Sequence, residues 1–148
     1  MSSFGNELNA KTLTYANTTF RTTQRNGALI DLTKDDVQNQ IFLGNAATIV
    51  RLPECVPALK GKMFTIYNGT AATGQSVTVQ KAAGDRINGY SDTVNGDIKL
   101  ENGVNNGDSI TSVTLIASGE RTYQSGSTTI VEIPGNWYVI STSYRNTA

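Results

Sequence analysis

Short runs of alternating apolar and polar residues, separated by turn residues, recur along most of the chain. The run at residues 76–80 alternates strictly as Ser-Val-Thr-Val-Gln, and a longer run at residues 109–117 follows the same pattern more loosely. A period of two residues is typical of a β-strand that is buried on one face. No stretch longer than about ten residues has the period of an α-helix. The pattern therefore predicts an all-β chain.

The predicted strands follow one another at intervals of roughly 10–14 residues, a spacing typical of a sandwich, a barrel or a prism. Residues 33–36 fit either a capped helical turn or a polar loop, and residues 56–59 either a loop or a single helical turn. Short strands leave unpaired edges, so we expect the sheet to close on itself or to associate with identical copies. The predicted strands cover residues 28–32, 40–43, 47–52, 62–67, 76–80, 84–87, 97–100, 109–117, 129–133 and 137–140.

Asn-Gly pairs occur six times and predict tight turns between successive strands. Asn and Gly reach the positive φ angles of a type I′ hairpin turn more easily than other residues. The expected fold is therefore a compact antiparallel β-sandwich, barrel or prism of short strands. Four of the pairs fall within residues 88–107, where we expect an exposed, loop-rich apex. The pairs are Asn26-Gly27, Asn68-Gly69, Asn88-Gly89, Asn95-Gly96, Asn102-Gly103 and Asn106-Gly107.

The first 26 residues are polar, rich in Thr and Asn, and only loosely alternating. Such a segment buries little of itself, so residues 1–26 are predicted to form an extended N-terminal arm that orders against a neighbour. Residues 27–148 are predicted to form the β-domain. An ordinary first strand of that domain is an equally good interpretation of the segment. The candidate contact residues of the arm are apolar and spaced like anchors on a tether: Phe4, Leu8, Leu13, Tyr15 and Phe20.

Composition narrows the range of partners. The chain has 148 residues, of which 38% are hydrophobic and only 16% are charged, so Ser, Thr, Asn and Gly must supply much of the surface. Twelve basic and twelve acidic residues give a net charge of +0, which argues against a nucleic-acid partner. No apolar run reaches the ~20 residues of a membrane-spanning helix. Residues 1–10 lack the basic start and apolar run of a signal peptide, so we expect synthesis in the cytoplasm without one.

Little catalytic chemistry is available to the chain. There is no histidine, which excludes a Ser-His-Asp triad and an imidazole base, and one cysteine is too few for the common zinc sites. Cys55 lies between Pro53 and Pro57 in an apolar stretch, and we interpret it as a small buried residue rather than a nucleophile. Trp137 and Tyr138 could stack on a sugar or a base, although at least one is expected to face the core.

Acidic residues gather in the turn-rich stretch between residues 85 and 108, where a calcium site is conceivable. No spacing matches an EF-hand loop, so we favour solvated turn residues. We expect no cofactor, no metal and no enzymatic activity, although paired carboxylates leave a polysaccharide hydrolase open. The acidic residues are Asp85, Asp92, Asp97, Glu101 and Asp108.

Four motifs carry a resemblance to a known family. Residues 52–53 read Leu-Pro, and residues 61–68 form a glycine followed by a Phe/Ile strand that ends in Asn. Residues 84–89 read Gly-Asp-Arg-Ile-Asn-Gly, and residues 137–141 read Trp-Tyr-Val-Ile-Ser. In this order, across about three quarters of the chain, they resemble the small β-modules of tailed-bacteriophage virion proteins. Those modules occur in capsid decoration (cement) proteins and at the tips of tail fibres and tailspikes.

The resemblance implies a homotrimeric, non-enzymatic virion protein. The expected function is that of a capsid decoration protein, which binds the outer capsid surface and stabilises the shell. Its partners would be copies of itself and the major capsid protein, with the arm gripping the shell or a neighbouring copy. The alternative is a receptor- or glycan-binding module of a phage tail fibre or spike.

Overall fold

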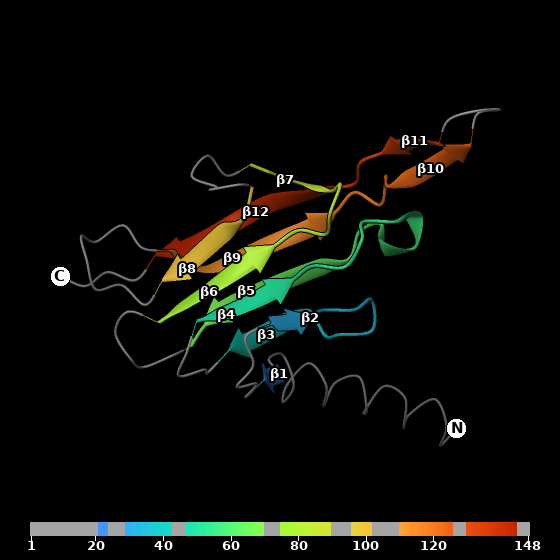
Figure 1. Cartoon of the computed structure of the whole chain (residues 1–148). Coiled ribbons are helices and arrows are strands. Elements are labelled where there is room, and N and C mark those ends of the chain that lie inside the picture. The colour runs from blue at the N-terminus through green and yellow to red at the C-terminus, as the bar shows by residue number, and fades with distance from the viewer. Residues whose placement is uncertain are drawn as a thin grey trace, which may run out of the picture.

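A computed structural model describes residues 21–23, 29–42, 47–69, 75–89, 96–101, 110–125 and 130–144. Within these ranges the chain forms twelve β-strands, one short 3₁₀ turn and no α-helix, which confirms the all-β prediction (Figure 1). The 3₁₀ turn, η1 (Pro57–Leu59), is the single helical turn allowed by the sequence pattern. Residues 33–36 form the polar loop instead, closed by a hydrogen bond from the Thr33 amide to Asp36 Oδ2 at 2.7 Å.

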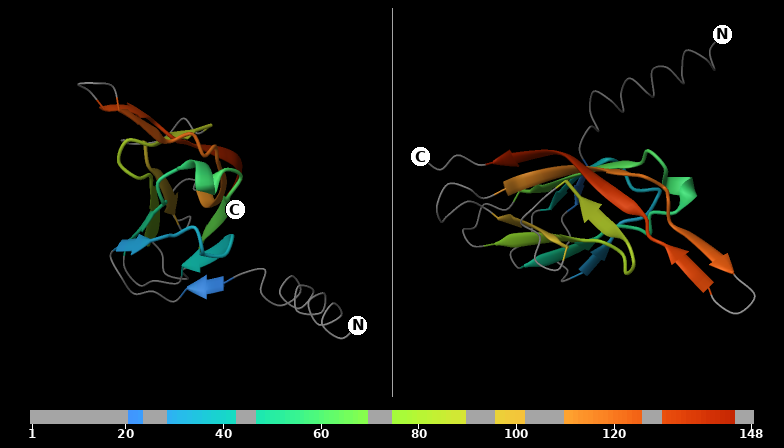
Figure 2. Two further views of the ribbon diagram at one scale, coloured as in Figure 1. Left: turned by 90° about the vertical axis from the view of Figure 1, so that its right-hand side faces the viewer. Right: turned by 90° about the horizontal axis from the view of Figure 1, so that it is seen from above.

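The strands form two facing sheets and a separate hairpin (Figure 2). The hairpin, β10 (Thr122–Ser125) with β11 (Ile130–Ile133), projects beyond one end of the two layers. The small sheet contains β2 (Leu29–Asp31), β4 (Thr48–Arg51), β6 (Ser76–Gln80) and β8 (Ile98–Glu101). The large sheet contains, in spatial order, β1 (Arg21–Thr23), β3 (Asn39–Phe42), β5 (Met63–Asn68), β9 (Ile110–Ala117), β12 (Asn136–Tyr144) and β7 (Arg86–Asn88).

The core lies between the two sheets, which makes the fold a sandwich among the three predicted alternatives. Each strand turns alternate side chains inward, so apolar residues at every second position meet in one layer. Phe64 and Trp137 of the large sheet pack together with their ring centroids 5.8 Å apart. Val50, Val79 and Leu100 come from the small sheet and are fully buried in the same cluster.

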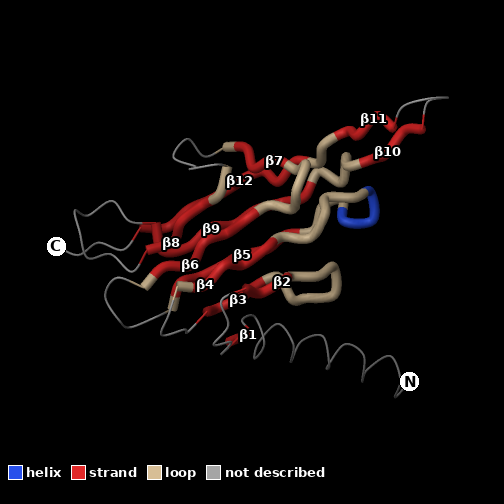
Figure 3. The backbone as a smooth tube through the Cα atoms, in the orientation of Figure 1, coloured by secondary structure: helices blue, strands red, loops and turns tan. Residues whose placement is uncertain are grey.

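Strand pairing is mixed, and the expectation of antiparallel pairing was wrong for five of the eight strand pairs of the sandwich, β7 with β12 included. Successive strands from β1 to β9 alternate between the large and the small sheet (Figure 3). As a result β1, β3 and β5 run parallel, as do β2, β4 and β6. The pairs β5–β9, β9–β12 and β6–β8 are antiparallel. The chain winds around its core, so neighbours in sequence face each other across it instead of pairing.

The two Asn-Gly pairs that can be followed completely are not hairpin turns. Asn68-Gly69 ends β5, but the next strand, β6, lies in the opposite sheet. The buried Asn68 amide donates hydrogen bonds to the carbonyls of Gln75 at 3.1 Å and Leu100 at 3.0 Å, which ties β5 to the small sheet. Asn88-Gly89 likewise ends β7 before the chain changes sheets. The other pairs lie wholly or partly outside the described residues.

Asn68→Ala should lower the free energy of unfolding by about 1–3 kcal/mol. The substitution removes this donor from the buried carbonyl of Leu100 and the partly buried carbonyl of Gln75, and an unsatisfied buried polar group costs about 1–3 kcal/mol. Urea titration followed by circular dichroism would measure the change. A loss no larger than that of Thr78→Ala, a residue on the outer face of β6, would contradict the role of Asn68 as a clamp.

One described strand, β10, was not predicted, because it lies in a polar stretch that lacks a clear alternation. β1 falls within residues 1–26, for which an extended arm and a first strand of the domain were equally good interpretations. β1 pairs with β3 in parallel, so residues 21–23 belong to the edge of the large sheet. The division between an arm over residues 1–26 and a domain over residues 27–148 stays a prediction.

Candidate functional site

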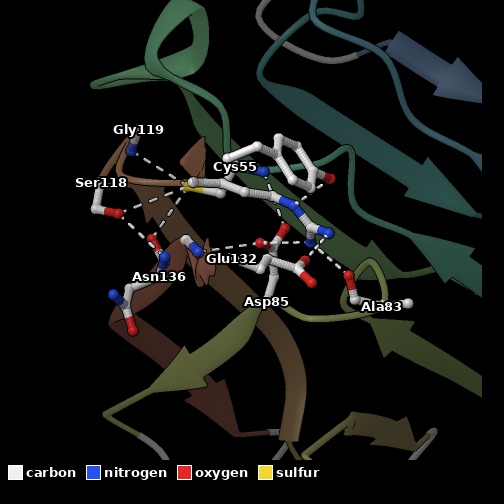
Figure 4. Close-up of polar contacts among 10 residues, drawn as sticks. Cys55, Ala83, Asp85, Ser118, Gly119, Glu132 and Asn136 are labelled. Carbon is white, nitrogen blue, oxygen red and sulfur yellow. Dashed lines mark hydrogen bonds and ion pairs between the residues drawn. The ribbon is translucent and has the colours of Figure 1, made fainter. Parts of the chain in front are cut away.

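A buried ionic cluster lies where the hairpin meets the sandwich. Arg121, immediately before β10, is only 5% exposed, and Asp85, immediately before β7, is 2% exposed. Arg121 Nη1 donates to Asp85 Oδ1 at 3.0 Å and to the Ala83 carbonyl, while Nη2 donates to Glu132 on β11 (Figure 4). Nε donates to the Tyr123 hydroxyl at 3.1 Å. The guanidinium therefore joins the hairpin to the turn that precedes β7.

Asp85, like Arg121, contacts several other residues of this cluster. Its Oδ2 accepts a hydrogen bond from the Cys55 amide at 2.9 Å, and Oδ1 accepts one from the Gly135 amide at 3.1 Å as well as the Arg121 contact. The Arg121 amide donates to the Cys55 carbonyl at 2.9 Å. The prediction that Asp85 is a solvated turn residue was wrong. Its carboxylate is buried because three segments that are distant in the sequence converge on it.

The buried charge of Arg121 is compensated by its surroundings. Burial alone would lower the pKa of Arg121, but hydrogen bonds to Tyr123 and Asp85 and the negative charges of Asp85 and Glu132 raise the pKa above its usual value. The side chain therefore stays protonated. Because protein groups engage all three guanidinium nitrogens, the arrangement suits a fixed clamp better than a group that takes part in chemistry.

Cys55 sits beside this clamp as a buried structural residue, which confirms its sequence interpretation. Its Sγ donates to the Asn136 carbonyl at 3.3 Å and accepts from the Gly119 amide at 3.2 Å (Figure 4). A Cβ atom at Gly135 would overlap Cys55 Cβ, so the backbone of Gly135 lies directly against the side chain of Cys55. A reactive thiol needs access to its substrate, which this packing does not provide.

The outer face of the large sheet is uncharged over three rows of paired residues. Within those rows Tyr67 is 40% exposed and Tyr138 is 42% exposed. Ile140, at an irregularity in β12, is 52% exposed beside them. The rows, each read across neighbouring strands, are Asn88–Tyr138–Ile116–Met63, Ser141–Thr114–Thr65–Asn39 and Ser143–Ser112–Tyr67–Ile41.

The outer face of the small sheet is more strongly charged, although the paired Leu29 and Ile49 are also exposed on it. It carries ion pairs between Asp31 and Arg51 at 3.5 Å and between Lys99 and Glu101 at 2.5 Å. Exposed charged side chains keep a sheet face in water, whereas an uncharged face with exposed tyrosine and isoleucine can be buried against another protein. The two faces of the sandwich are therefore suited to different surroundings.

The structure brings only some of the predicted site residues together. Trp137 is fully buried and Tyr138 is exposed, which confirms that one of them faces the core. In the part of the chain that is described, no group of three or more His, Cys, Asp or Glu residues could hold a metal ion. Arg121, the centre of the buried cluster, belongs to no sequence motif and was missed. The arm residues Phe4, Leu8, Leu13, Tyr15 and Phe20 lie outside the described residues, as do Asp92 and Asp108.

Comparison with known proteins identifies no similar protein. No protein-family model matches the chain, and neither the curated proteins nor the solved structures contain a match. Among the described residues, no helix has the length and apolar character needed to span a membrane.

Proposed function

We propose that this chain is a capsid decoration protein of a tailed bacteriophage, a non-enzymatic trimer that binds the outer capsid surface and stabilises the shell. The observation that carries the proposal is the set of three uncharged rows on the outer face of the large sheet, which Arg86 of β7 borders at the edge. Such a face can meet a copy of itself without repulsion between like charges. Protein interfaces are depleted of charge at their centre and enriched in tyrosine, which Tyr67 and Tyr138 provide here.

In the proposed trimer the large sheets face the threefold axis and the charged small sheets face solvent. A specific interface buries about 800 Å² on each partner, and the six strands of the large sheet would provide the contact surface. The motif resemblance and the predicted arm support attachment to a capsid. Apolar burial contributes about 25 cal/mol per Å², and many copies around the shell would add their contacts together. The partners are then two further copies of the chain and the major capsid protein, and the protein is located in the virion.

Tyr138→Lys tests the trimer. It places an unpaired ammonium in the proposed interface, which should raise the dissociation constant of the trimer at least ~100-fold, equivalent to about 2.7 kcal/mol. Sedimentation velocity over a range of protein concentrations would measure the shift from trimer to monomer. Thr78→Lys is the matched control, because it adds the same charge to the outer face of the small sheet. A monomeric wild-type protein would contradict the proposed trimer. So would equal changes in the dissociation constant for Tyr138→Lys and Thr78→Lys.

Attachment to the capsid has its own test. Wild-type protein added to undecorated particles should co-sediment with them and raise the temperature at which they release DNA. Removal of residues 1–20 should abolish co-sedimentation if the arm is the part that binds the capsid. Protein that never co-sediments with particles but adsorbs to host cells would favour the alternative, a receptor- or glycan-binding module of a tail fibre or spike. The observation that favours this alternative is a groove on the small sheet.

A further inference from the structure

A polar groove with a volume of about 830 Å³ crosses one end of the outer face of the small sheet. It is bordered by the ends of β2, β4 and β6 and by the segments 52–54 and 81–84 that leave those strands. Its volume falls within the ~300–1,000 Å³ typical of small-ligand sites. Its charged and amide side chains are Asp31, Arg51, Glu54, Gln80, Lys81 and Asp97.

Four of these side chains form a row across the sheet. Asp31 pairs with Arg51, and Arg51 pairs with Gln80, on adjacent strands. Arg51 Nη1 lies 3.5 Å from Asp31 Oδ1, Arg51 Nε donates to Gln80 Oε1 at 3.4 Å, and Gln80 Nε2 donates to Asp97 Oδ2 at 3.3 Å. All three contact distances exceed the roughly 2.7–3.2 Å that is typical of an N–H···O hydrogen bond. A ligand can therefore exchange them for its own at small energetic cost.

Carboxylates stand at both ends of the row. The Asp31 carboxylate is exposed, whereas Asp97 Oδ1 is buried and lies 3.9 Å from Lys81 Nζ. Strands lie about 4.8 Å apart, so the row presents carboxylate, guanidinium, amide and carboxylate over roughly 14 Å. Acceptors and donors thus alternate along the groove. A hydroxyl group, which both donates and accepts, can bond to any of these positions.

The charge balance of the groove selects the class of ligand. Asp31, Glu54 and Asp97 stand against Arg51 and Lys81, which leaves a net formal charge of −1. Neither a polyphosphate nor a polycation therefore finds the large excess of opposite charge that it needs. A neutral ligand with many hydroxyl groups fits this mixture. Pro53 and Ala83 supply accessible apolar lining that can pack against the C–H face of a sugar ring, with the buried Leu52 and Ala82 behind them.

We propose that this groove binds a segment of a neutral oligosaccharide, whose hydroxyl groups bond to the row from Asp31 to Asp97. The site lies on the face opposite to the proposed trimer contact, so it does not depend on trimer formation. A monomeric Tyr138→Lys variant would still bind the sugar. A trimer that binds no sugar would contradict only the proposed binding site in the groove.

The test is a titration of the full chain with neutral glucose, mannose and galactose hexasaccharides, followed by amide chemical shifts. Binding of at least one should give saturable shifts at residues 51, 52, 54 and 80–84. Arg51→Met should weaken that binding at least tenfold, and Asp31→Asn should weaken it in the same direction. Lys99→Met, which removes a cation from the same sheet face outside the groove, should stay within twofold of wild type.

Three outcomes would overturn the proposal. One is the absence of saturable shifts with all three neutral hexasaccharides at millimolar concentration. Another is binding of a heparin hexasaccharide alone, which would identify an anion site. The third is equal weakening by Arg51→Met and Lys99→Met. Thermal unfolding of each variant establishes that the fold is intact, and Asp31→Asn keeps the test valid if Arg51→Met unfolds.

Discussion

Asp85→Ala is expected to lower the free energy of unfolding by about 3–5 kcal/mol, because it leaves the buried Arg121 charge without its principal partner. Asp85 also accepts hydrogen bonds from the Cys55 and Gly135 amides, and both donors would lose that acceptor. The hairpin should detach before the sandwich unfolds, because the Arg121 side chain connects it to the turn that precedes β7. Urea unfolding followed by circular dichroism would measure the loss, and hydrogen exchange of residues 122–125 would report the detachment.

Two further variants give this prediction its controls. Asp31→Ala removes one partner of an exposed ion pair and should change stability by less than ~1 kcal/mol. Asp85→Ala combined with Arg121→Met removes both charges, so it should recover part of the loss because no unpaired charge remains buried. If Asp85→Ala is as mild as Asp31→Ala, or if the double variant is no more stable than Asp85→Ala, the cluster does not hold the hairpin.

Trp137→Ala should be comparably damaging, with a loss of about 3–5 kcal/mol. Trp137 is fully buried and packs against Phe64 at the centre of the sandwich, so the truncation leaves a large cavity between the sheets. It is the single tryptophan of the chain, so unfolding of the variant must be followed by circular dichroism and not by tryptophan fluorescence.

Trp137→Phe should be much milder, with a loss below ~1.5 kcal/mol. The indole Nε1 has no hydrogen-bond partner among the described residues, and a buried donor in that state costs about 1–3 kcal/mol. Phenylalanine removes this donor, which offsets part of the lost packing. A loss above ~3 kcal/mol for Trp137→Phe would show that the indole N–H has a partner.

Most of the strands could be predicted from local patterns. Residues 76–80 alternate strictly, and β6 has those bounds, because a period of two residues suits a strand that is buried on one face. β10 could not be predicted in this way. Its residues are polar, and they are extended through pairing with β11 in a hairpin that Arg121 anchors. The uncharged rows of the large sheet were also beyond prediction, since they appear only once the register of five strands is known.

By itself the sequence determined that the chain is all-β, that a small thiol is buried near Pro53 and that one of Trp137 and Tyr138 faces the core. These properties depend on the alternation and size of nearby side chains, which act over a few residues. Tertiary structure alone decided that successive strands cross between two sheets, and that Asp85 is buried against Arg121, 36 residues away in the chain. The reason is that Asn-Gly and Gly-Asp turns set only local backbone angles. The partner of a strand or of a charge is selected by which apolar faces and which opposite charges can be buried together.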